Sequence, residues 1–143
     1  MTIAIKIGVV LACLLFICIQ ARYQAKRFKQ QKTIEHWGKA AIFGLFVALL
    51  TVCCMFGHWH EWKTYTAWFD IPLLGTVTRI AFFDPILNPL RSPPQSLFYN
   101  GPKNIHQEGQ SLQDWIENKL STGWVKALKI FYIAAFVAAL IFI

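Results

Sequence analysis

Three possible metal ligands stand close together in the stretch HWHEW, at His58, His60 and Glu61. Imidazole nitrogens and carboxylate oxygens are zinc ligands in catalytic sites, so this stretch allows a metal-dependent membrane enzyme. The spacing alone does not fix a tetrahedral site, and the interleaved Trp59 and Trp62 are typical of the boundary between membrane and water. We therefore favour polar interfacial residues here, with a metal site as the alternative.

Four polar residues interrupt the otherwise apolar stretch from residue 64 to 88, namely Asp70, Arg79, Asp84 and Asn88. Ionisable residues inside membrane segments are costly and mark structural or functional sites. Arg79 and Asp84 would point about 140° apart on one continuous helix, because each residue turns the helix by about 100°. The dipeptide Asp84-Pro85 is typical of a helix start, with Asp as N-cap. We expect Asp84 to cap a new turn or to approach Arg79 across a helix break, and Arg79 otherwise to contact lipid phosphate.

The cysteines and the remaining motifs do not indicate catalysis. The four cysteines lie inside the first two apolar runs and include no C-x-x-C pair, so we predict that they fill space as small apolar residues. They are Cys13, Cys18, Cys53 and Cys54. The sequence contains no Walker motif and no nucleophile elbow. These observations favour a protein that is not an enzyme and needs no cofactor.

Composition indicates a membrane protein. Of the 143 residues, 56% are hydrophobic, and the mean hydropathy is +0.44, whereas soluble proteins are about 45–50% apolar. Because a membrane-spanning helix needs about 20 apolar residues, we predict an all-α integral membrane protein with four transmembrane helices in a single membrane domain, residues 1–143. The predicted spans are residues 2–19, 40–57, 64–83 and 124–143. The third contains Pro72 and either crosses the membrane fully or is partly re-entrant. A short amphipathic helix, residues 111–121, is expected on the membrane surface before the last span.

The distribution of charge gives the orientation and supports the third span. The formal net charge is +7, and cytoplasmic loops near membrane helices are enriched in Lys and Arg. With four spans only Lys6 and Lys63 lie outside, whereas with three spans eight of the 14 Lys and Arg residues would do so. Residues 22–39 and 84–123 are therefore predicted to form cytoplasmic loops, and both termini to be extracytoplasmic, in a bacterial inner membrane.

The basic residues after the first span are candidates for contact with anionic lipid headgroups, because cations that flank apolar segments attract such lipids. These residues are Arg22, Lys26, Arg27, Lys29 and Lys32. The cations flank membrane segments rather than forming a patch on a soluble domain, so no nucleic-acid partner is expected.

Three stretches in the second half of the chain carry a resemblance. They are TRIAFFDPILNPLR at residues 78–91, LFYNG at 97–101 and QDWIENKL at 113–120. Together they resemble small uncharacterised membrane proteins encoded by phages and prophages of Bacteroidetes-type bacteria. The positions that match the recurring pattern are Arg79, Phe83, Asp84, Pro85, Asn88, Tyr99 and Gly101. The resemblance implies several short membrane spans and no particular activity.

Three functional hypotheses follow from these patterns. The leading one is a non-enzymatic membrane protein that acts through helix contacts, as a homo-oligomer or as a small subunit of a larger membrane assembly. Gly44 and Ala48 have the small-xxx-small spacing that lets another helix approach closely. The second hypothesis is a holin-like pore former, and the third is the metal-dependent enzyme that uses His58, His60 and Glu61.

Overall fold

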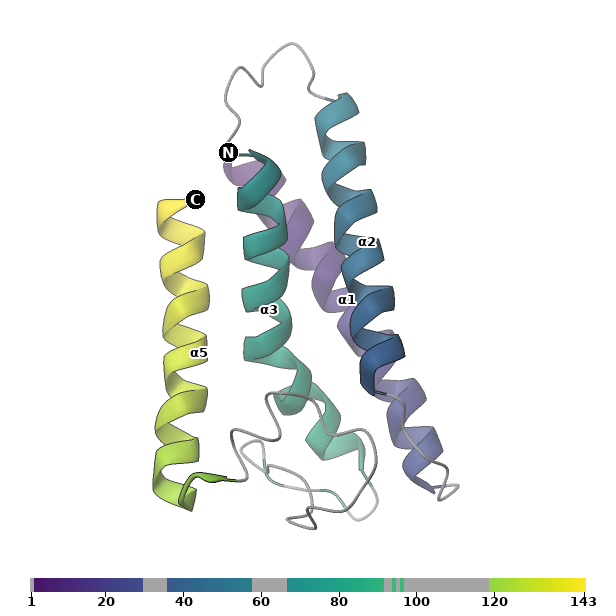
Figure 1. Cartoon of the computed structure of the whole chain (residues 1–143), viewed down its shortest axis with the longest axis vertical. Coiled ribbons are helices and arrows are strands. Elements are labelled where there is room, and N and C mark those ends of the chain that lie inside the picture. Colours follow the sequence, from purple (N-terminus) through teal and green to yellow (C-terminus); the bar gives the residue numbers. More distant parts are fainter. Residues whose placement is uncertain (1, 30–35, 58–66, 92–93, 95, 97–118) are drawn as a thin grey trace.

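The computed structural model describes residues 2–29, 36–57, 67–91, 94, 96 and 119–143. The described chain is helical: α1 spans Ile3–Lys29, α2 His36–Gly57, α3 Ala67–Leu90 and α5 Thr122–Phe142. Consecutive helices run in opposite directions, so both termini lie at the same end of the bundle, which is the upper end in Figure 1. The prediction of an all-α protein is confirmed. The predicted surface helix, residues 111–121, lies almost wholly outside the described residues.

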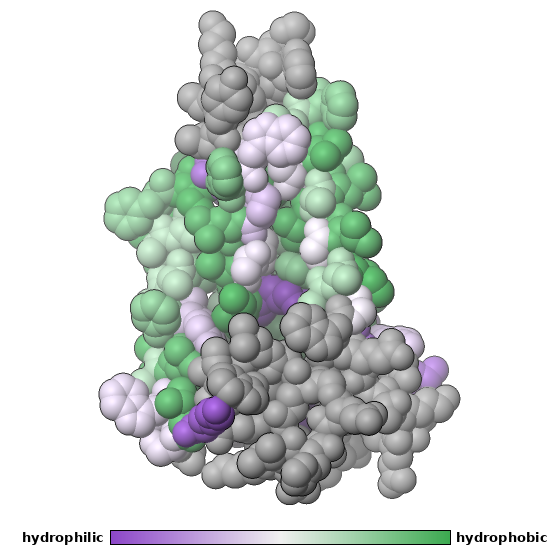
Figure 2. Space-filling model, in the orientation of Figure 1, coloured by the Kyte–Doolittle hydropathy of each residue, from purple (hydrophilic) through white to green (hydrophobic). Residues whose placement is uncertain are grey.

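Three of these helices are long and apolar enough to cross a membrane. Their span-like parts are Ile3–Lys26, Gly38–Phe56 and Gly123–Phe142, which correspond to the first, second and last predicted spans. The apolar surface is turned outward: α1 exposes a large side chain on every fourth residue along one face, and these are Ile3, Ile7, Leu11, Leu15, Ile19 and Tyr23. Figure 2 shows such apolar side chains over much of the described surface. An outward apolar surface of this extent is the pattern of an integral membrane protein.

Two boundaries differ from the sequence-based expectation at the lower end of the bundle. Residues 22–29 were expected in a loop but continue α1 as far as Lys29. Ala, Gln, Lys and Arg dominate this stretch, and all of them favour helix. The connection between α1 and α2 is accordingly shorter than the predicted loop 22–39, because α2 begins at His36.

The helix start predicted at Asp84-Pro85 is wrong, because α3 runs through Pro85 and Pro89 as one helix that ends at Leu90. A proline inside a helix removes one backbone hydrogen bond and bends the axis, and Figure 1 shows α3 bending in its lower half. Beyond the bend, Leu87 is buried in a cluster with Ala21 and Ala25 of α1. This packing stabilises the continued helix where the local sequence favours a break.

α3 is the central helix, since it packs against α1, α2 and α5. The main core cluster draws on all four helices, and its buried members are Val9, Cys13, Ile17, Phe43, Val47, Ile71, Leu74, Ala81 and Phe136. α3 lies close to α2 at Gly75, where a Cβ atom would lie 3.0 Å from a methyl carbon of Val47. At Gly44, the position singled out in the sequence, a Cβ would meet nothing within 4 Å, so the close contact inside the bundle is made by α3.

Candidate functional site

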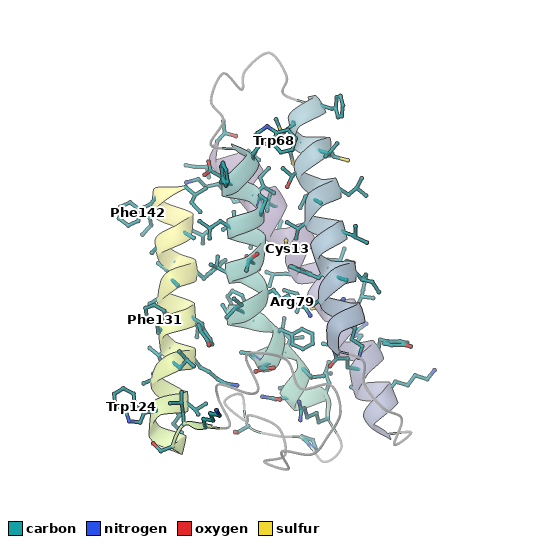
Figure 3. All side chains as sticks on the ribbon, in the orientation of Figure 1. Cys13, Trp68, Arg79, Trp124, Phe131 and Phe142 are labelled. Atoms are coloured by element: carbon teal, nitrogen blue, oxygen red, sulfur yellow. The ribbon has the colours of Figure 1, made fainter. Side chains whose placement is uncertain are left out.

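Arg79 lies on α3 inside the lower half of the bundle, where Figure 3 labels it between α3 and α2. Its guanidinium carbon is 4.7 Å from the ring centroid of Phe43 on α2 and 4.8 Å from that of Phe83 on α3. Its Nη1 donates a hydrogen bond to Oε1 of Gln20 on α1. An arginine over aromatic faces gains cation–π attraction, which is stronger away from water. The side chain therefore joins α3 to both α1 and α2.

Gln20 extends this connection to the backbone of α2. Its Nε2 donates to the carbonyl oxygen of Lys39 at 3.3 Å, while its Oε1 accepts from Arg79. One amide side chain thus uses its donor and its acceptor on two different helices. Polar side chains that bond across helices hold membrane bundles together, because lipid offers them no partner.

Asp84 turns to the other side of α3, toward α5. Its Oδ2 accepts a hydrogen bond from Nζ of Lys129 at 3.0 Å, and the exposed fractions of the two side chains are 16% and 5%. On a continuous helix, Arg79 and Asp84 point about 140° apart, which explains why one reaches α1 and α2 and the other reaches α5. We name Gln20, Arg79, Asp84 and Lys129 the polar cluster, and its bonds tie α3 to all three neighbours.

Lys129 lies on α5 near the start of the last predicted span, and its side chain is buried against Asp84. The pairing was recognisable in principle, since charged residues inside membrane segments pair with one another. The contribution of Gln20 had no comparable signal, because a single glutamine at the end of an apolar run is unremarkable in sequence. Neither residue was among the predicted site residues.

The other predicted polar residues are distributed unevenly around this cluster. Asn88 is fully buried one turn beyond Asp84, which places it on the same side of α3. Asp70 is distant from the cluster, in the first turn of α3 near the upper end, where a carboxylate interacts favourably with the helix dipole. Thr78, which was not among the predicted residues, is buried and donates to the carbonyl oxygen of Leu74 at 2.6 Å.

The predicted lipid-contact and metal residues are only partly described. Arg22 and Lys26 are exposed near the lower end of α1, and Arg27 and Lys29 belong to the same helix. Lys32 lies outside the described residues, as do the metal candidates His58, His60 and Glu61. Within the part of the chain that the structure describes, no three His, Cys, Asp or Glu side chains are grouped to hold a metal ion.

No family model matches this chain, and neither a curated protein nor a solved structure proved similar to it.

Proposed function

We propose that the chain is a non-enzymatic membrane protein with four spans, acting through contacts of its outer helix faces with copies of itself or with other subunits of a membrane assembly. The observation that carries this proposal is that the polar cluster is engaged inside the bundle. Arg79, Asp84 and Lys129 are engaged in contacts between helices, so these ionisable side chains hold the bundle together. What the described helices offer to a partner in the membrane is their apolar outer surface.

The fourth span in this proposal is α3. It contains Asp70, Arg79 and Asp84, and charged residues oppose insertion at the centre of a membrane helix. This opposition is reduced where the charges are bonded to neighbouring helices, and α3 packs against α1, α2 and α5. With α3 as a span, the charge distribution supports extracytoplasmic termini and a cytoplasmic basic end of α1. We further propose that the protein lies in a bacterial inner membrane and that it is related to phage-encoded membrane proteins.

One outer face has residues suited to a helix partner. Gly44 and Ala48 are both exposed on α2, and a Cβ at Gly44 would have open space around it. Small residues four apart allow two helix backbones to approach closely in membranes.

Crosslinking in native membranes tests the proposal. In a background where the natural cysteines are replaced by alanine, Ala48→Cys on the small face is expected to form a crosslinked dimer or a product with another membrane protein. Leu15→Cys on the exposed face of α1 is the control and is expected to react much less. A protein that stays monomeric in membranes at these positions and at others around the outer surface would refute the proposal. Collapse of the membrane potential on expression would favour the holin-like alternative.

A further inference from the structure

We propose that Arg79 forms part of a binding site for a phosphate group, supplied by an anionic phospholipid of the leaflet at the lower end of the bundle. The site is built from Arg79, with Gln20, Phe43 and Phe83 holding its guanidinium in place. This inference is independent of whether the chain forms oligomers.

The bonding of Arg79 leaves it able to bind an anion. A guanidinium has five N–H groups in one plane, and the hydrogen bond to Gln20 uses one of them. Gln20 is a neutral amide and the rings of Phe43 and Phe83 are uncharged. Among the described residues, no carboxylate lies within ion-pair distance of Arg79. Asp84 forms its ion pair with Lys129 instead. Phosphate suits the remaining donors because arginine binds its oxygens in a bidentate manner.

Asp84 is the charge that opposes such a ligand. It interacts electrostatically with Arg79, but its Oδ2 is held by Lys129 at 3.0 Å on the side facing α5. The two cations and one carboxylate of the polar cluster carry one net positive charge. An anion next to Arg79 would therefore meet attraction that the single carboxylate only partly offsets.

The depth and exposure of Arg79 fit a lipid phosphate. Phe43, against which the guanidinium lies, is five residues inside the start of the α2 span at Gly38, which corresponds to about 8 Å. This depth is about half of one hydrocarbon leaflet, which is about 15 Å thick. A phosphate can reach an arginine at such a depth because the bilayer thins locally and the side chain extends toward the headgroups. Arg79 is partly exposed, so a ligand can reach its guanidinium.

Lipid binding to the purified full-length protein tests the site, with affinities measured by native mass spectrometry. We expect phosphatidylglycerol to bind at least about tenfold more tightly than phosphatidylcholine with the same acyl chains, since the choline cation offsets the phosphate. Arg79→Gln should lower the affinity for phosphatidylglycerol about tenfold. The matched control is Arg22→Gln, which removes an exposed cation and should lower the affinity by about fivefold at most.

A variant that is expected to bind the lipid more tightly separates an effect on the site from a loss of binding through misfolding. Asp84→Asn removes the opposing carboxylate and should raise the affinity for phosphatidylglycerol, measured on protein that keeps the helical circular-dichroism spectrum of the wild type. An unchanged or lower affinity in such folded protein would count against the site. Displacement of the lipid by inorganic phosphate would support a phosphate site but assign it to a soluble ligand. Equal affinity of the wild type for the two lipids would overturn the proposal even if no variant folds, and so would equal losses in Arg79→Gln and Arg22→Gln.

Discussion

Gly75→Ala is expected to destabilise the bundle although alanine favours helix more than glycine does. The added methyl group would lie 3.0 Å from Cγ2 and 3.2 Å from Cγ1 of Val47, and 3.5 Å from Sγ of Cys13. Favourable contacts between carbon atoms begin at about 3.5 Å, so both methyl groups of Val47 would have to move. Val47 is 5% exposed and, being β-branched, has little freedom at χ1.

The magnitude follows from two opposing terms. Overpacking of a filled core costs about 1–3 kcal/mol, whereas replacing glycine by alanine in a helix gains about 1 kcal/mol. We expect a net loss of about 1 kcal/mol for Gly75→Ala. Gly8→Ala is the matched control, because a Cβ there would have no neighbour within 4 Å, and it should be neutral or slightly stabilising.

A double-mutant cycle with Val47→Ala makes this prediction decisive. The smaller residue at 47 provides space for the new methyl group, so the overpacking term should disappear and the two substitutions should couple favourably by about 1–3 kcal/mol. The assay is unfolding by SDS in mixed micelles, followed by circular dichroism. Additivity within about 0.5 kcal/mol would show that α3 does not approach α2 at Gly75 as described, and would refute the packing argument.

Two further predictions concern the polar cluster. Asp84→Asn or Lys129→Gln alone should destabilise the protein by about 3–5 kcal/mol in the same unfolding assay, because each removes one charge of a buried ion pair. The double substitution should cost clearly less than the sum of the two, and additive losses would argue against the ion pair. Gln20→Leu should cost about 1–3 kcal/mol by removing the acceptor of Arg79, whereas Leu15→Ala, on the exposed face of α1, should change the stability much less.

The sequence predicts the helices better than it predicts their partners. The runs that form α1, α2 and α5 are apolar over enough residues to be recognised alone. The continuation of α3 through Pro85 was missed because the local signal of Asp84-Pro85 favours a helix start, whereas the packing of Leu87 against α1 favours continuation. Tertiary contacts of this kind override the structure that the local sequence favours, and they cannot be recognised from the sequence of one segment.

The polar cluster was predicted only in part, for a related reason. Arg79 and Asp84 were recognisable because charge is rare in membrane segments. Their partners lie 59 and 45 residues away in sequence, at Gln20 and Lys129 respectively. Helical periodicity shows which residues share a face of one helix, but it does not show which helix that face meets.

The sidedness of the two termini decides whether α3 is a fourth membrane span. Thr2→Cys and Ile143→Cys would be introduced separately in a cysteine-free background and treated with an impermeant maleimide in intact cells. If α3 is a span, both positions should react from outside, and Gln31→Cys should react only after the membrane is permeabilised. Reaction of one terminus in intact cells and of the other only after permeabilisation would mean an odd number of spans. The four-span arrangement would then be wrong.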